Sequence, residues 1–391
     1  MLPALLFSLL FFLPAWFLWR RDRRGWALVP LATALLLLTF TFLLFADAAN
    51  HRQTLADTRA LLRQLAQPDL LEATALTDAD EQLFLVSTAT TALLRSRPLV
   101  AALEQPRADG LSVRAIDSTL AYLAAWLTKT ADYRATRRNA DWDREVFYLA
   151  HAGAILLNYQ LATGQPDYEA TTKAIGRHLG RRLERSRYKH LISRPTEEFY
   201  RPADNAAAVF TLRLHDELFG TTYAADTYQD WSRYLADELY YAESRLPCAA
   251  FSPDNRCHLE PSATATGLYV AYRAAAVPPA DDIPWREWLH YFAESSLSPF
   301  SVTVRPGMRD GRQARFCSQG AAPLDCGRYE NAIGLWAAAE FEGEYAFFRL
   351  YSTYALRRWF LAPVDYAAYR PTRRVHLLTE VALRTMGTAR W

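Results

Sequence analysis

The sequence contains few of the patterns that build familiar metal and nucleotide sites. Its eight histidines are scattered without metal-ligand spacing, and its four cysteines form no CxxC pair. No glycine-rich phosphate loop and no GxSxG nucleophile elbow occurs in the 391 residues. These absences argue against zinc, nucleotide and serine-hydrolase chemistry, and we expect neither a metal nor a cofactor.

The chain also has no large excess of positive or negative charge and no long strand-like alternation of apolar and polar residues. Lys and Arg total 44 against 42 Asp and Glu, and they are distributed along the chain, so we expect no nucleic-acid partner. From about Asp78 onward, apolar residues recur at three- and four-residue spacing, and alternating runs are short. The pattern predicts an all-α domain.

Two apolar runs lie at the N-terminus. Residues 2–18 and 27–45 are nearly uncharged, and each is about long enough to cross a hydrocarbon core of roughly 30 Å as a helix. A signal peptide is the alternative for the first run, but no small-residue cleavage site follows it. The basic loop RRDRR at 20–24 favours a cytoplasmic turn. We expect a transmembrane hairpin over 1–46 in the inner (cytoplasmic) membrane, in contact with the lipid bilayer, with both termini and the globular domain extracytoplasmic (periplasmic).

The cysteines fall into two close pairs, Cys248 with Cys257 and Cys317 with Cys326. An even number of cysteines in an oxidising compartment indicates disulfides, and the spacing favours two local bridges that fix loops. A cross-link between the two loops remains an alternative.

Residues 47–76 are predicted to form a stalk or first helix, and residues 77–391 the extracytoplasmic domain. Within that domain, four segments begin with small residues, continue with aliphatic and aromatic ones, and are followed by a turn and a second helix. They are AHAGAILLNYQLATG (150–164), DNAAAVFTLRLHDELFG (204–220), ATATGLYVAYRAA (263–275) and ENAIGLWAAAEFEG (330–343).

Small residues let inner helices approach closely, while the more charged second helices suit an outer layer. We therefore predict an (α/α)6-type toroid of helical hairpins, with an open α-solenoid as the alternative. Long loops at 246–262 and 297–328 would form its rim.

The inner helices of such a toroid begin at one mouth, where their free N–H groups and dipoles favour negative charge. Polar residues stand near each start. The candidate catalytic residues are Asp204, His151, Glu330 and Glu260, and the candidate substrate-binding residues are Tyr200, Trp142, Asp143, Asn205, Glu198 and Tyr329. Helix capping is the alternative role for such residues, and a lone histidine in an apolar helix is often a core group.

Asp204 is the leading candidate because it precedes Asn205 and three alanines, which would place its carboxylate in the crowded ring interior beside Tyr200 and Arg201. Aromatic residues beside carboxylates suit sugar rings, since aromatic faces stack on apolar sugar faces while acids bind hydroxyls.

The stretch from Tyr148 through His151 to NYQLATG (158–164), with DN at 204–205, LHDELFGTTY at 214–223 and Trp231, resembles the linalool dehydratase/isomerase family. The resemblance, over about 80–345, implies an (α/α)6 barrel active outside the cytoplasm. It places His151 at the family's Y-x-x-H histidine. The family's C-E-P-D-N-x-F-x-x-C-N motif carries two catalytic cysteines, and Asp204 and Pro195 stand at their positions here.

Three functions follow as hypotheses. The first is a membrane-anchored enzyme that acts on a glycan or lipid-linked saccharide by carboxylate acid/base chemistry, as a glycoside hydrolase or lyase. The second is a hydro-lyase or isomerase on an isoprenoid alcohol, an apolar small molecule. The third is a non-catalytic subunit that assembles with other membrane proteins in the envelope.

Overall fold

The computed structural model describes most of the chain. The residues it describes are all except 1–5, 7, 22, 68–69, 72–78, 104–109, 131–141, 143–144, 187–188, 278–282, 298–300, 306, 308–326, 361–363 and 391.

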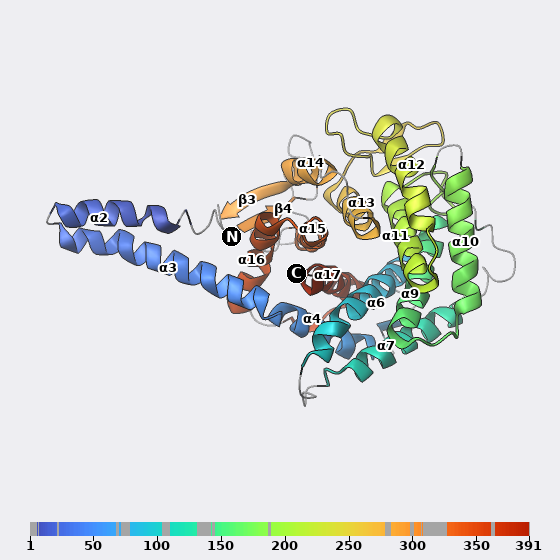
Figure 1. The fold of residues 1–391 in the computed structure, drawn as a ribbon, viewed down its shortest axis with the longest axis horizontal. Helices are drawn as coiled ribbons and strands as arrows, with labels where there is room; N and C mark the ends of the chain where they lie inside the picture. Colours follow the sequence, from blue (N-terminus) through green and yellow to red (C-terminus); the bar gives the residue numbers. More distant parts are fainter. Residues whose placement is uncertain are drawn as a thin grey trace.

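An N-terminal helical hairpin projects from one side of the molecule (Figure 1). It consists of α2 (Phe12–Arg20) and α3 (Arg24–Ala49), which pack against each other. Most of the large apolar side chains exposed to solvent belong to this hairpin. The helical stretch Gly25–Ala49 is long and apolar enough to cross a membrane, judged by length and composition alone, whereas Ser8–Arg20 is apolar but shorter.

The rest of the chain forms a closed double ring of helices (Figure 1). Each inner helix packs against the next, and the last returns to the first, which closes the ring. The inner helices are α6 (Ala79–Ala101), α9 (Val146–Thr163), α11 (Pro202–Phe219), α13 (Ala263–Ala276), α15 (Arg328–Glu340) and α17 (Pro371–Arg390). The predicted toroid is confirmed, and the open solenoid is wrong because α17 packs against α6.

An outer helix alternates with each inner one along the sequence. These outer helices are α4 (Arg52–Leu65), α7 (Val113–Lys129), α10 (Glu169–Arg185), α12 (Tyr223–Glu238), α14 (Ile283–Phe292) and α16 (Glu344–Phe360). The stretch expected to be a stalk or first helix contains α4, which packs against α17 and α6.

Small residues set the spacing of the inner helices. A Cβ added at Gly153 would lie 2.8 Å from a methyl of Thr211, and one added at Gly267 would lie 2.8 Å from a methyl of Ile333. Gly387 packs equally closely against the backbone of α15 at Leu335. Larger side chains at these positions would force the helices apart, because protein interiors have no spare volume.

The strands in the described part of the chain form two short antiparallel hairpins. The first pairs β1 (Ala250–Phe251) with β2 (Cys257–Leu259), and the second pairs β3 (Ala293–Leu297) with β4 (Ser301–Val304); a 3-10 turn, η4 (Tyr366–Ala368), precedes α17. The expected local disulfide Cys248–Cys257 is present and closes the first hairpin. The expected Cys317–Cys326 pair lies outside the described residues.

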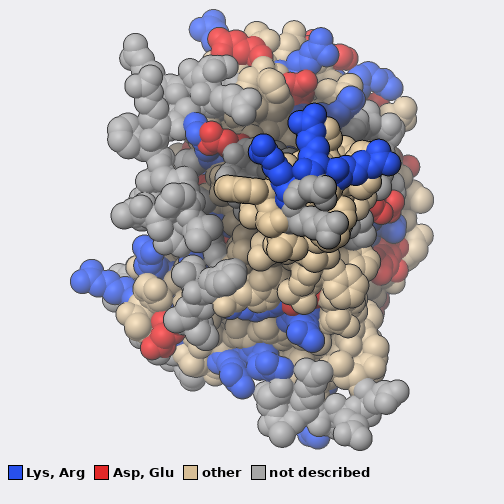
Figure 2. All heavy atoms as spheres, turned by 90° about the vertical axis from the view of Figure 1, so that its left-hand side faces the viewer, with Lys and Arg blue, Asp and Glu red and all other residues tan. Residues whose placement is uncertain are grey.

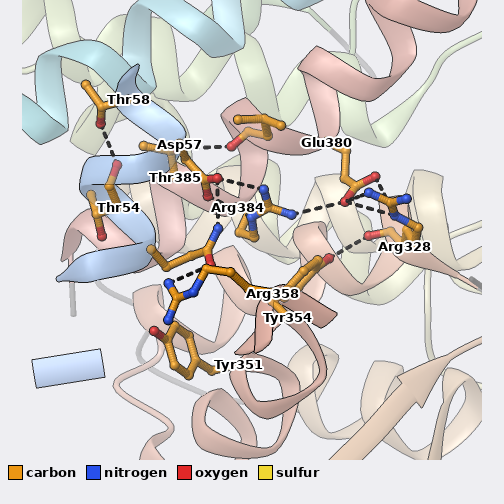
Figure 3. A network of polar contacts seen from close by, with 12 residues as sticks. Thr54, Asp57, Thr58, Arg328, Tyr351, Tyr354, Arg358, Glu380, Arg384 and Thr385 are labelled. Atoms are coloured by element: carbon orange, nitrogen blue, oxygen red, sulfur yellow. Dashed lines mark hydrogen bonds and ion pairs between the residues drawn. The ribbon is translucent and has the colours of Figure 1, made fainter. Parts of the chain in front are cut away.

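A buried network of charges joins α4, α15 and α17 (Figure 3). Both oxygens of Asp57 accept hydrogen bonds of 2.7 Å from the Arg384 guanidinium, which also binds Glu380 at 3.1 Å. Glu380 in turn binds Arg328 at 3.1 Å. Attraction to Asp57 outweighs burial and raises the pKa of Arg384 above its ordinary value.

A second part of this network ties the end of α3 to α16. Asp47 accepts a hydrogen bond of 2.5 Å from the Tyr351 hydroxyl and forms an ion pair with Arg358. Arg358 also donates to Gln53 of α4 at 3.1 Å. The hairpin and the ring are therefore joined by bonded polar groups as well as by chain connection.

Replacing Arg384 with Met should lower the free energy of unfolding by about 3–5 kcal/mol, because Asp57 would be left buried without its cation. The matched control is Arg233→Met, since Arg233 is 64% exposed in its pair with Asp230, and should change stability by about 0–1 kcal/mol. Chemical denaturation followed by circular dichroism in detergent measures both. Equal losses in the two variants would contradict this role of Asp57–Arg384.

Candidate functional site

A cavity of about 320 Å³ opens where the inner helices begin. Its walls come from the first turns of α6, α9, α11, α13 and α15 and from the loops before α11 and α13. The lining residues are Asp80, Glu81, Phe84, Phe147, His151, Arg194, Arg201, Ala203, Asp204, Ala249, Ser262, Thr264, Ala265, Leu268, Tyr272 and Tyr329. Charged and aromatic side chains thus share one open mouth.

Asp204 is the buried acid of this cavity. It lies in the first turn of α11, is 9% exposed, and its Oδ2 atom has no hydrogen-bond partner in the part of the chain described. Burial raises the pKa of the Asp204 carboxyl to about 6, although Arg194, a hydrogen bond from Ser193, and Arg201 pull it down. The cost of desolvating the charged form is therefore larger than the gain from nearby cations.

Arg194 connects the acids around the mouth. Its Nε donates to Asp80 at 2.5 Å, and its guanidinium lies 4.4 Å from the centre of the Phe147 ring. Arg201 is held by Glu197 at 2.8 Å, and the same Glu197 oxygen lies 3.8 Å from the Arg194 guanidinium. The cavity wall thus carries two guanidinium groups whose positions are fixed by carboxylates.

His151 lies in the wall as a neutral ring. Burial, together with the positive charge of Arg194, lowers the pKa of His151 to about 3. Its Nδ1 is 3.0 Å from the Ser87 hydroxyl, and the rings of Phe84 and Phe147 pack against it at 5.2 and 4.6 Å. His151 can therefore accept or donate a hydrogen bond near neutral pH, but it carries no charge there.

Two tyrosines complete the polar wall. Burial raises the pKa of both Tyr272 and Tyr329 above the ordinary value, so both phenols stay protonated and can donate a hydrogen bond. Tyr329 stacks on His376 with 4.7 Å between ring centres. The neighbouring Glu330 does not line the cavity but accepts a hydrogen bond of 3.1 Å from Thr264, which does.

The structure separates the other candidates from this cavity. Glu260 and Glu198 are exposed side chains outside the lining, and Asp143 lies outside the described residues. Asn205 binds the backbone N–H and C=O of Leu191. Thus Asn205 orders the loop before α11. Neither Glu260 nor Glu330, the two acids expected as partners of Asp204 in catalysis, lines the cavity.

Tyr200 and Trp142 also lie outside the lining. Tyr200 exchanges two backbone hydrogen bonds of 2.8 Å with Phe251, which ties the loop before α11 to the rim hairpin. Trp142 instead packs edge-on against His178 of α10, with ring centres 5.2 Å apart.

The candidate residues did not include six polar residues of the cavity, which are Asp80, Glu81, Arg194, Tyr272, Ser262 and Thr264, and Arg201 was expected only as a neighbour of Asp204. Asp80 and Glu81 could have been identified from the sequence, because acids lie at the start of α6 as they do near the starts of other inner helices. No local sequence pattern identifies Arg194, because only the folded loop brings it to Asp80.

Comparisons with known proteins give little further information. No family model and no curated protein matches the chain, so the resemblance to the linalool dehydratase/isomerase family finds no support. Among solved structures, an inactive variant of the alpha-1,6-mannanase GH76A of Salegentibacter sp. HEL1_6, in complex with alpha-1,6-mannotriose, has a TM-score of 0.48 at 9% identity, over 88% of this chain and 99% of that one. At this level the likeness assigns neither a family nor an activity.

Replacing Asp204 with Asn should change how stability depends on pH. The native carboxyl has a pKa of about 6 against an ordinary 3.8, so the folded state binds more protons between these values and stability falls as pH rises through them. Asp204→Asn should therefore be more stable than the parent by about 3 kcal/mol at pH 8 and nearly equal to it at pH 3.

Thermal unfolding of both proteins across this pH range is the measurement. Glu260→Gln, which neutralises an exposed acid outside the cavity, is the control. Parallel curves for the parent and Asp204→Asn would show that Asp204 is not a desolvated acid.

Proposed function

We propose that this protein is a membrane-anchored, extracytoplasmic α/α-barrel enzyme that acts on a glycan or a lipid-linked saccharide by carboxylate acid/base chemistry. The observation that carries the proposal is Asp204, a buried carboxyl whose pKa is raised to about 6 at the mouth of the ring. An acid of this kind is protonated for part of the time near neutral pH, which is what proton donation to a leaving group requires.

In a glycosidic cleavage, the protonated Asp204 carboxyl would donate its proton to the oxygen of the departing sugar, as that bond breaks. A second carboxylate must then activate water or stabilise the sugar cation. Glu81 is our choice for this group, because it lines the same mouth and makes no ion pair among the described residues. Asp80 is instead engaged by Arg194.

The remaining wall suits a saccharide. The half-buried Phe84 offers aromatic surface to the apolar face of a sugar, and Ser262 and Thr264 offer hydroxyls close by. Neutral His151 would orient a substrate hydroxyl or carry a proton between groups.

The two other functions receive less support. A hydro-lyase for an isoprenoid alcohol needs a narrow, mostly apolar cavity. The accessible wall of this cavity is mostly apolar, but the cavity is open and the charged Asp80, Arg194 and Arg201 line it. A non-catalytic subunit gains nothing from a buried Asp204, whose desolvation lowers stability at neutral pH.

We place the ring outside the cytoplasm, held by the α2–α3 hairpin in the bilayer. Two features support this placement. Apolar side chains cover the hairpin, and basic side chains gather at its end, which faces the viewer in Figure 2. Positive loops stay on the cytoplasmic side, so the ring at the other end would lie outside.

Asp204→Asn should reduce turnover of a glycan substrate by about 100-fold or more, because the proton donor is lost. Glu81→Gln should give a comparable loss, and Glu260→Gln should retain parental activity. Release of reducing ends from a panel of oligosaccharides and lipid-linked saccharides measures turnover. Full activity of Asp204→Asn would contradict the proposal, and so would dehydration of an isoprenoid alcohol in place of glycan cleavage.

Alkaline phosphatase fused after Trp391 should be active in cells, and a green fluorescent protein fused at the same point should be dark, because both reporters would lie outside the cytoplasm. Replacing the four arginines of the 20–24 loop with Ser should weaken this preference. A bright fluorescent fusion with inactive phosphatase would overturn the orientation.

A further inference from the structure

A second hollow lies on the outer layer, along α10. It is a groove of about 380 Å³, and we call it the α10 groove. Its lining residues are Trp142, Ala174, Arg177, His178, Arg181, Arg182 and Arg185. The described lining residues include four arginines and no carboxylate, so this part of the groove is positive although the whole chain has a formal charge of only +2.

The arginines form a regular row. Arg177, Arg181 and Arg185 are exposed and stand four residues apart, so they project from one face of α10 over about 12 Å. None of the three has an ion pair within the described chain; Arg177 donates only to the Lys173 carbonyl, at 3.2 Å. Like charges at this spacing destabilise a helix, so the row has a cost in the free protein.

A flat aromatic ring borders this row. Trp142 is half-buried and is held edge-on against His178. A fixed indole beside guanidinium groups can stack on the apolar face of a sugar while the cations bind its acidic substituents. Aromatic and cationic groups together fit a sugar chain better than an inorganic anion.

The position of α10 limits the choice of partner. Figure 1 places it at the end of the molecule opposite the α2–α3 hairpin. The bilayer that holds the hairpin is therefore on the other side of the ring, and its headgroups are not the partner that the α10 groove meets.

We propose that the α10 groove binds an acidic polysaccharide, a chain whose repeating units carry carboxylate or other anionic groups. The choice of a glycan among polyanions rests on the proposed function of the ring; the choice of an anionic one rests on the charge of the groove. The overall balance of 44 Lys and Arg against 42 Asp and Glu hides this row, which becomes visible only when the residues are placed on α10.

Binding of the full chain in detergent to immobilised polygalacturonate tests the proposal, with neutral dextran as the reference polymer. The test variant is Arg181→Ser/Arg185→Ser. The control is Arg114→Ser/Arg213→Ser, which removes two exposed arginines from α7 and α11. We expect binding that weakens with salt and falls roughly tenfold or more in the test variant, while the control binds like the parent.

The proposal is wrong if the test variant binds polygalacturonate as well as the parent does, or if both double variants lose binding equally. It is also wrong if dextran retains the protein as well as polygalacturonate does. A preference for anionic vesicles or duplex DNA that the test variant loses would also overturn the proposal. Neither Arg181 nor Arg185 lines the ring cavity, so turnover of a short oligosaccharide should be unchanged in the test variant. Loss of polymer binding with intact turnover supports the α10 groove, whereas specific polymer binding without any turnover in the parent would reject only the proposed function.

Discussion

The close approach of six inner helices is the constraint on which the structure depends. Gly153, Gly267 and Gly387 lie where a Cβ would collide with the neighbouring helix. Because the helices are this close and begin at the same mouth, the side chains of their first turns face one small volume. For the buried Asp204 carboxyl, the loss of hydration outweighs the combined pull of Arg194, Arg201 and a hydrogen bond from Ser193 on its pKa.

Buried ion pairs then fix how the ring closes and how the hairpin joins it. Asp57, Arg384 and Glu380 link the first outer helix, α4, to the last inner one, α17, beside the α17–α6 contact that closes the ring. Asp47 and Arg358 fix the end of α3 to α16. Such pairs add little net stability compared with apolar packing, but the loss of one partner leaves the other charge buried and unpaired, which is strongly destabilising. They are therefore well suited to define one register for the closing helices.

The sequence predicts the architecture better than it predicts the site. Small residues at helix starts identify four of the inner helices, and the position of Asp204 before three alanines identifies the buried acid. Glu260 looked equivalent, but Ser262 caps α13 by accepting from Ala265 N–H at 3.2 Å, and Glu260 stays exposed outside the helix. Arg194 enters the cavity only because Asn205 and the Tyr200–Phe251 pairing fold the preceding loop back. Contacts of that kind are set by tertiary packing and leave no local pattern.

The central claim is that burial inside the ring raises the pKa of the Asp204 carboxyl to about 6, so that a part of the population is protonated near neutral pH. Infrared difference spectroscopy between the parent protein and Asp204→Asn, recorded as a function of pH, tests it directly, because only the parent contributes the protonated carboxyl band of this residue. The account predicts that the band disappears with a midpoint near pH 6. A midpoint near the ordinary 3.8 would show that Asp204 is a solvated carboxylate and would remove the basis for its role as an acid.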